Sequence, residues 1–181
     1  MKLVDIRDYC EELALLIDDD IEHHNGYKMT SFDNSHDLLH NCITIMENNT
    51  GYFWGISIDN KIAGFFGFYA HATPTNDYCF LTRTYLLKNY RSSGVNKHLK
   101  EIISTVFNHY RLPLYAKIHK DNPRSIGSIL RMYGVFQYYD NDYSVFMLSH
   151  GDFILKDKVI NVVSRVSNKI NILMSDSVVL L

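Results

Sequence analysis

Apolar positions along the chain follow two spacings, one typical of helices and one typical of strands. Apolar residues that recur every three or four positions predict amphipathic helices at residues 7–24, at 35–47 and in the segment after residue 94. Runs rich in aromatic, β-branched and threonine residues predict strands at 2–6, 52–58, 62–70, 79–87, 114–119 and 135–139. This alternation of helices and strands predicts an α/β fold.

Two of these strands, 52–58 and 62–70, flank a turn sequence at 59–61 and are predicted to form an antiparallel hairpin. Gly64 and Gly67 lie inside the second strand, where a glycine marks either a β-bulge or the close approach of another backbone. The aromatic residues of this hairpin, including Trp54, are expected in the core.

The most informative stretch is Tyr90-Arg91-Ser92-Ser93-Gly94-Val95-Asn96, which joins the strand at 79–87 to a helix. The first N–H groups of a helix have no partner within it and lie at the positive end of its dipole. A short Ser/Gly turn at this place therefore suits a phosphate or diphosphate. Alternatively, the serines and the glycine only cap the helix. The turn is neither a Walker loop nor the three-glycine dinucleotide fingerprint.

A second strand-to-helix unit follows along the chain. After the strand at 114–119, Asp121-Asn122-Pro123 is typical of a helix start with proline in the first turn. The helix carries apolar residues at helical spacing and ends near Gly134, before the strand at 135–139.

Together the two units resemble the GNAT superfamily of acetyl-CoA-dependent N-acyltransferases. The family signature Arg/Gln-x-x-Gly-x-Gly/Ala is matched by residues 91–96 except at its last position, Asn96. A second family element is an asparagine that opens the next helix, a small residue three positions later and an aromatic-glycine ending. Here these are Asn122, Ser125 and Tyr133-Gly134. The order of helices and strands resembles that of the family over about residues 1–148. The motifs that make the resemblance specific lie within about residues 79–139.

The resemblance implies a GNAT-like α/β (α+β) fold over residues 1–150, with a mixed, mostly antiparallel central sheet and helices on both faces. It implies that the strands at 79–87 and 114–119 splay apart and admit the acyl-carrying arm of acetyl-CoA. The implied activity is transfer of an acetyl group to a primary amine by direct attack. The alternative is a GNAT-fold protein that has lost its chemistry and serves in assembly, for example as a bacteriophage virion component.

The resemblance also assigns residues to the cofactor. Backbone amides of the turn would surround the diphosphate, and main-chain groups of Leu86 and Leu87 would bond the pantetheine arm. One of these two N–H groups could also stabilise the oxyanion. Asn122 and Ser125 would line the arm from the other side. The turn residues assigned in this way are Arg91, Ser92, Ser93, Gly94, Val95 and Asn96.

The departures from the family pattern concern catalysis. Ile129 stands where the family often has the tyrosine that protonates the departing thiolate, and Tyr133, one helical turn later, is the candidate for that role. The strand at 79–87 has no Asp, Glu or His, although family members often place a general base there. His71 is the candidate base because its pKa range suits the role, with Asp77 as another option. The alternative for both is a solvated loop residue.

The C-terminal segment is predicted to form an extra helix over about residues 155–174, within an extension at 151–181. Its apolar stripe consists of Val159, Val163, Val166, Ile170 and Leu173, at spacings of four, three, four and three. Either this helix packs back on its own domain, or the stripe is a seam for self-association or for docking on a larger assembly. The apolar end at 178–181 is expected to need a partner or a groove.

Composition narrows the functional classes. With 181 residues, 46% apolar content and a net charge of −2, the chain suits one domain and does not suit nonspecific nucleic-acid binding. No stretch resembles a signal peptide or a membrane span, so a cytoplasmic protein is expected. The three scattered cysteines are expected to be buried thiols in a reducing compartment.

Two polar groupings receive no role. His36 and His40 have the i, i+4 spacing of a zinc-binding pair, but the sequence shows no third ligand. A surface pair is therefore expected, and no metal is assigned. The acidic run at 18–20 could attract a cationic substrate, but a solvated face is the expectation.

Overall fold

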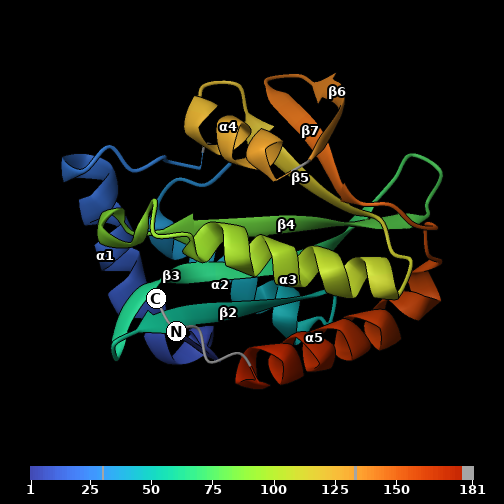
Figure 1. The fold of residues 1–181 in the computed structure, drawn as a ribbon, viewed down its shortest axis with the longest axis horizontal. Coiled ribbons are helices and arrows are strands. Elements are labelled where there is room, and N and C mark those ends of the chain that lie inside the picture. Colours follow the sequence, from blue (N-terminus) through green and yellow to red (C-terminus); the bar gives the residue numbers. More distant parts are fainter. Residues whose placement is uncertain (30, 133, 177–181) are drawn as a thin grey trace.

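A computed structural model describes residues 1–29, 31–132 and 134–176. Its strands form one seven-stranded sheet in the order β1-β2-β3-β4-β5-β7-β6 (Figure 1). All neighbours are antiparallel except β4 and β5, which are parallel. The strands are β1 (Lys2–Asp5), β2 (Gly51–Ile58), β3 (Lys61–Ala72), β4 (Tyr78–Leu86), β5 (Leu114–His119), β6 (Val135–Asp140) and β7 (Tyr143–Ser149).

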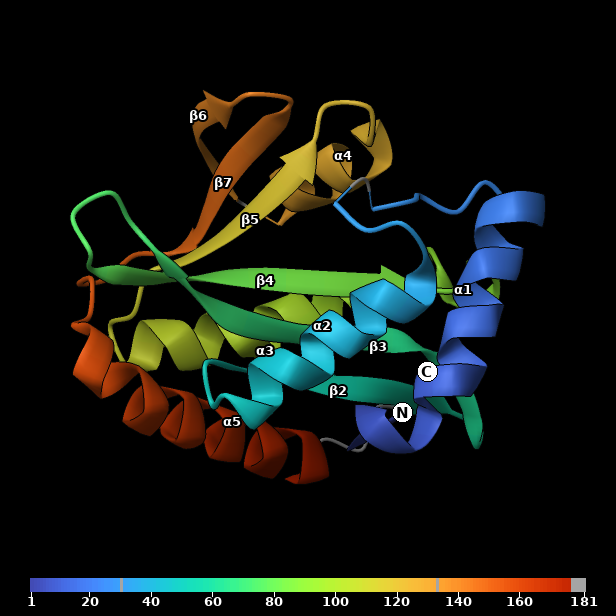
Figure 2. The same ribbon diagram turned by 180° about the vertical axis from the view of Figure 1, so that it is seen from behind.

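Helices cover both faces of the sheet, as Figures 1 and 2 show from opposite sides. The helices α1 and α2 lie on one face, α3 and α5 lie on the other, and α4 packs beside β5 and β7. The α-helices are α1 (Cys10–His23), α2 (Ser35–Glu47), α3 (Val95–His109), α4 (Pro123–Arg131) and α5 (Val159–Asp176). Short 3-10 turns at Ile6–Tyr9, Lys88–Tyr90 and Lys156–Lys158 precede α1, α3 and α5. These observations confirm the predicted fold class.

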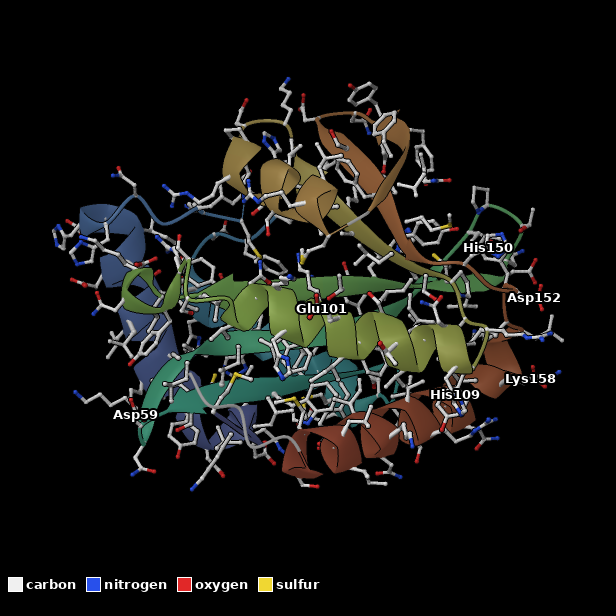
Figure 3. All side chains as sticks on the ribbon, viewed as in Figure 1. Asp59, Glu101, His109, His150, Asp152 and Lys158 are labelled. Atoms are coloured by element: carbon white, nitrogen blue, oxygen red, sulfur yellow. The ribbon has the colours of Figure 1, made fainter. Side chains whose placement is uncertain are left out.

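The alternation of side chains along β2, β3 and β4 divides the core into two clusters. On the α3–α5 face, Phe68, Phe80 and Phe107 pack edge to face with ring centroids 5.2–5.8 Å apart. On the α1–α2 face, Phe53 and Phe65 contact the apolar stripes of the two helices. Charged side chains such as those of Asp59, at the β2–β3 turn, and Glu101, on α3, are exposed to solvent; both are labelled in Figure 3.

The two glycines of β3 have the roles predicted for them. Gly64 has φ +148°, and a Cβ there would lie 2.1 Å from the carbonyl oxygen of Tyr85. The β2–β3 register shifts beside it, between Ile56 and Ser57, as at a β-bulge. Gly67 lies against the backbone of β2, where the Tyr52 carbonyl oxygen would meet a Cβ at 2.3 Å. The first glycine marks a bulge and the second a close approach.

The parallel strands β4 and β5 separate along their length. They pair at Phe80–Leu114, Leu81–Tyr115 and Thr82–Ala116, and the described register ends there. β5 continues instead with β7, which pairs with it as far as His119. The splayed strand pair that the resemblance implied is thus present, and Figure 2 shows the β5–β7–β6 arm turning away from β4.

One strand was missed in the sequence. β7 (Tyr143–Ser149) lies between β5 and β6 and forms a tight hairpin with β6, with Asn141 at φ +52° in the turn. The Asp140-Asn141-Asp142 turn followed by an alternating apolar run is a hairpin signal that could have identified it.

The C-terminal helix packs on its own domain. Val159, Val163, Val166 and Ile170 of α5 are at most 4% exposed and belong to the same core cluster as α3. Asn171 of α5 also accepts a 2.7 Å hydrogen bond from the Trp54 indole on β2. The interpretation of this stripe as a free seam for self-association or docking was therefore wrong, because the domain core already buries it.

The tail at 178–181 lies outside the described residues. Among the described helices, none has both the length and the apolar character that crossing a bilayer requires.

Candidate functional site

A cleft of about 290 Å³ passes through the opening between β4 and β5. Because side chains alternate along a strand, its wall has two halves. Thr82, Thr84 and Ala116 face α3 and α4, whereas Arg83 and Lys117 face α1 and α2. The cleft therefore connects the two faces of the sheet.

The N-terminus of α3 is open on its outer side. Gly94 precedes the helix with φ +86°. In the part of the chain that the structure describes, no side chain caps the first N–H groups, and a Cβ on Gly94 would meet nothing within 4 Å. Ser93 turns its hydroxyl back to the carbonyl of Tyr90, at 2.7 Å, and Ser92 adopts φ +66°. The serines therefore shape the turn instead of capping the helix. This leaves backbone donors and a helix dipole facing open space, which is the arrangement that a diphosphate needs.

The Arg91 side chain holds this turn in place. It forms an ion pair with Asp20 of α1, and its Nε donates to the carbonyl oxygen of Leu86 at 2.9 Å. Asp20 is 2% exposed and also accepts from the Tyr85 hydroxyl at 2.7 Å and from the Lys88 N–H at 3.0 Å. Burial and this hydrogen bond raise the pKa of Tyr85. The expectation that residue 20 belongs to a solvated face was wrong, since it is the buried anchor of the turn.

Strand alternation corrects one residue assigned to the pantetheine arm. The Leu87 N–H donates to the Ala63 carbonyl of β3 at 2.9 Å, so Leu87 faces β3 and cannot bond a molecule in the gap. In an antiparallel ladder with this register, the main-chain groups of Leu86 and Thr84 face the other way, toward β5. The main-chain groups of Leu86 and Thr84, and not those of Leu87, are therefore the ones that face the gap, and the Leu86 carbonyl oxygen already accepts from Arg91.

Polar atoms without partners line the α3–α4 half of the cleft. The Thr84 Oγ1 and the Asn96 Oδ1 are buried and have no hydrogen-bond partner among the described residues. The Asn96 Nδ2 lies 3.4 Å from the Ser128 hydroxyl of α4, so this side chain turns toward α4. Buried polar atoms are normally paired, so these atoms fit a polar ligand arm that passes between α3, α4 and the separated strands.

The start of α4 forms the opposite wall. Asn122 caps the helix by accepting from the Ser125 N–H at 3.1 Å, and both residues line the cleft. Ile129 is fully buried against Ala116 and Phe146 and is not among the lining residues. Tyr133, the sequence candidate for the general acid, lies outside the described residues and stays a prediction.

Lys100 lies one turn after Asn96 on α3 and also lines the cleft. Its side chain is only 9% exposed, and burial lowers its pKa from 10.5 to about 8. Within residues 1–29, 31–132 and 134–176, no hydrogen bond or ion pair of its ammonium group is found. An unpaired buried lysine is costly, so its presence in the wall of a cleft suggests a role with a ligand.

On the α1–α2 face, His71 lines the cleft near the end of β3. Partial burial, and next the positive charge of Lys117, lower its pKa below 6.5, so the imidazole is neutral at pH 7. Lys117 itself pairs with Asp140 at 2.5 Å. Asp77, the other sequence candidate for a base, does not line the cleft.

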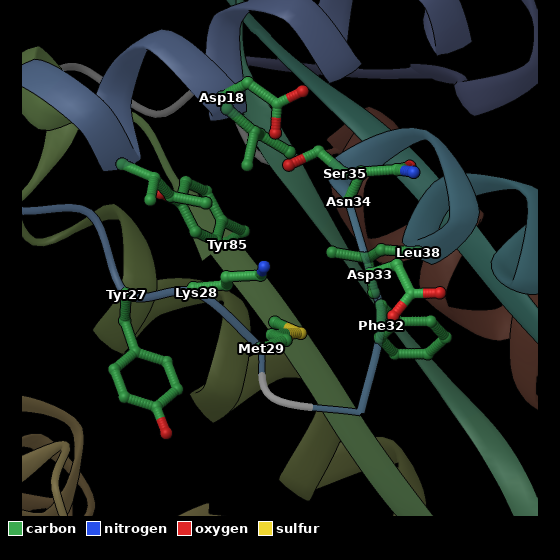
Figure 4. Close-up of a pocket in the computed structure, with 12 residues that line it drawn as sticks. Asp18, Tyr27, Lys28, Met29, Phe32, Asp33, Asn34, Ser35, Leu38 and Tyr85 are labelled. Carbon is green, nitrogen blue, oxygen red and sulfur yellow. The ribbon is translucent and has the colours of Figure 1, made fainter.

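A smaller cavity of about 220 Å³ adjoins the cleft through Tyr27, Met29 and Phe32 (Figure 4). It lies between the end of α1 and the start of α2, and its charged lining residues are Asp18, Lys28 and Asp33. The loop between α1 and α2 therefore walls both cavities on the face where a second substrate would approach.

The sequence matches the family described as the acetyltransferase (GNAT) family over residues 13–134, more than half of the chain. The chain belongs to the GNAT family. A comparison with curated proteins found no match. The assembly alternative, a GNAT fold without chemistry, finds no support in these comparisons.

Solved structures share the fold at low sequence identity. The microcin C7 self-immunity acetyltransferase MccE, in complex with acetyl-CoA and AMP, is 19% identical, with 77% of this chain and 86% of that chain covered and a TM-score of 0.56. RimL, the ribosomal L7/L12 alpha-N-protein acetyltransferase in complex with coenzyme A, is 13% identical, with 84% and 92% covered and a TM-score of 0.57. An acetyltransferase from Thermus thermophilus is 10% identical, with 81% and 94% covered and a TM-score of 0.63.

Several residues of this GNAT site had no signal in the sequence. No sequence motif includes Arg83, Thr84 or Lys100. They line one cleft because of the strand register of the sheet and the packing of α3. Asp20 was recognisable as charged, but nothing local indicated burial. β4 has no acidic residue in its sequence, and the structure shows that it presents Arg83 to the cleft.

The histidine pair of this GNAT protein has neighbours that the sequence did not show. The Cys10 sulfur, a Glu11 carboxylate oxygen and a His40 ring nitrogen lie within 4.8 Å of one another, and His36 Nε2 lies 2.9 Å from Glu11. None of these four residues lines the cleft. The three cysteines are buried as predicted, and burial raises the pKa of Cys42 and Cys79 to about 11.

Proposed function

We propose that this protein transfers the acetyl group of acetyl-CoA to a primary amine. The observation that carries the proposal is a continuous route. It runs from the uncapped N-terminus of α3, through the gap between β4 and β5, to a face that carries a histidine of lowered pKa. Family membership and solved relatives whose names include acetyl-CoA or coenzyme A support it.

The residues at the start of α3 would hold the diphosphate. The backbone N–H groups from Gly94 to Asn96 point out of an uncapped helix, and the open space above Gly94 leaves room for the anion. Main-chain groups of Thr84 and Leu86 would bond the pantetheine arm, as a strand would, along the unpaired edge of β4. Asn122 and Ser125 would line its other side.

The thioester would supply the acetyl group, and the protein would supply position and a proton acceptor. His71 is neutral at pH 7 and lines the cleft on the acceptor face, so it would accept the proton that the attacking amine loses. The walls of the cleft would hold the amine against the carbonyl carbon. An N–H of β4 facing the gap would stabilise the developing oxyanion.

The test is calorimetric titration with acetyl-CoA, and with desulfo-CoA as a ligand that lacks the sulfur. The expected result is micromolar binding that is lost in Gly94→Trp, because the indole would fill the space above the turn. Asn89→Trp, an exposed position in the preceding turn, is the matched control and should bind normally. Absence of binding to the folded wild-type protein at millimolar ligand would overturn the proposal.

A further inference from the structure

An arginine marks the point where β4 and β5 separate. Thr82 and Ala116 form the last described pair between the two strands, so Arg83 and Lys117 are the first residues beyond it. Strand alternation places both on the α1–α2 face, and both line the cleft. The acceptor side of the gap is thus framed by two basic side chains, of which Lys117 is already paired with Asp140 at 2.5 Å.

Arg83 has aromatic neighbours and neutral hydrogen-bond partners. It lies opposite Gly67 in the β3–β4 register. Its Cζ lies 4.9 Å from the Tyr69 ring centroid, 5.1 Å from that of Phe32 and 5.7 Å from that of Phe53. Stacking of this kind fixes the plane of the guanidinium without neutralising its charge.

No carboxylate compensates this charge within the described residues. The Arg83 Nη1 donates to the Asn41 Oδ1 at 3.1 Å and to the Cys42 sulfur at 3.4 Å, and no ion pair of Arg83 is found. Among the described residues that line the cleft, none is an aspartate or a glutamate, whereas Arg83, Lys100 and Lys117 are cationic. Asp140 does not line the cleft and pairs with Lys117 at 2.5 Å. The acidic lining residues Asp18 and Asp33 belong to the adjoining cavity, which shares Tyr27, Met29 and Phe32 with the cleft.

We infer that the amine acceptor carries an anionic group, a carboxylate or a phosphate, and that Arg83 binds this group. The inference rests on the proposed acetyl transfer and names the class of its second substrate. Arginine presents a planar fork of donors that matches both oxyanions, and the aromatic rings around it hold that fork ready.

The positions of Arg83 and His71 suit one acceptor molecule. The guanidinium stacks on Tyr69, and Tyr69 and His71 project from the same face of β3. Two residues along a strand span about 7 Å. An amine a few bonds away from its own anionic group can therefore lie beside His71 while the anion contacts Arg83.

The experiment compares probe pairs that differ in one anionic group. L-phenylalanine and its amide test a carboxylate, and O-phosphoethanolamine and ethanolamine test a phosphate. Binding of each is measured by titration of ¹⁵N-labelled protein, with and without saturating coenzyme A, while the Arg83 Nε–Hε resonance is followed. The charged member of at least one pair should bind about tenfold more tightly or better, and should shift that resonance.

Variants separate charge recognition from folding. Arg83→Gln should abolish the preference, and Arg83→Lys should keep part of it because the cation remains. Arg165→Gln is the matched control, because Arg165 also stacks on a ring, that of Tyr110 at 4.7 Å, but does not line the cleft. That variant should keep the full preference.

Equal affinity for both members of both pairs, including no binding of any probe, would overturn the inference. A preference that survives in Arg83→Gln would also overturn it. If the preference is present but acetyl-CoA itself does not bind, the anion site stands and the acetyl-transfer proposal fails.

Discussion

Lys100 carries a positive charge in the wall of the cleft, and removing it should stabilise the protein at neutral pH. Its side chain is 9% exposed, and no described residue pairs with it. Burial lowers its pKa from 10.5 to about 8, and each pKa unit corresponds to 1.36 kcal/mol. The charged form should therefore cost about 3 kcal/mol of stability at pH 7.

The sign of the pH dependence follows from the two pKa values. Between pH 8 and pH 10.5 the unfolded chain keeps the Lys100 proton and the folded chain has lost it, so stability rises with pH in this window. The cost should fall from about 3 kcal/mol at pH 7 to about 1 kcal/mol at pH 10.

Urea unfolding of the wild type and of Lys100→Met measures this cost, because methionine keeps the apolar stem and removes the charge. The variant should be the more stable at pH 7, and its advantage should shrink by about 2 kcal/mol at pH 10. Lys97→Met, an exposed position on the same helix, is the control and should show no such trend. A Lys100→Met advantage that is the same at both pH values would refute the reasoning.

Other perturbations test the remaining parts of the account. Asp20→Asn should lower the free energy of unfolding by about 3 kcal/mol, because it leaves the Arg91 guanidinium, whose side chain is 18% exposed, without its buried carboxylate partner. In the same urea titration, Asp19→Asn at an exposed position should change it by less than about 0.5 kcal/mol. In the His71→Gln variant, the fall of the acetyl-transfer rate at acidic pH should disappear. In the wild type this fall should lie below pH 6.5, where the imidazole gains a proton, and a fall that persists in the variant would exclude His71 as the base. Val163→Asp should lower the free energy of unfolding by more than about 3 kcal/mol in a urea titration, because Val163 is only 4% exposed. A urea midpoint equal to that of the wild type would contradict the packing of α5.

The order of elements was predictable because each one carries its own local signal. The second helix was predicted at 35–47 and is observed at Ser35–Glu47, since an Asn34 cap and an apolar stripe mark it. The strand at 114–119 was also predicted with its observed bounds. A glycine inside an apolar strand indicates either a bulge or a close backbone approach, and only the structure shows that Gly64 lies at the bulge.

Long-range geometry was not predictable in the same way. The direction of the Arg91 side chain depends on Asp20, 71 residues away in the sequence. Whether the main-chain groups of Leu87 or of Thr84 face the gap depends on the β3–β4 register, which decides which residues of β4 bond to β3. The apolar stripe of α5 is the same whether it meets this domain or another, and only the structure shows the packing against α3.

The central claim is that acetyl-CoA enters the gap between β4 and β5 from the N-terminus of α3. A crystal structure of the protein grown with acetyl-CoA tests it most directly. The account predicts the diphosphate on the backbone amides of Gly94 to Asn96, and the pantetheine arm between Thr84 and Asn122. Density for the cofactor at another place, or an empty gap in crystals grown at millimolar acetyl-CoA, would contradict it.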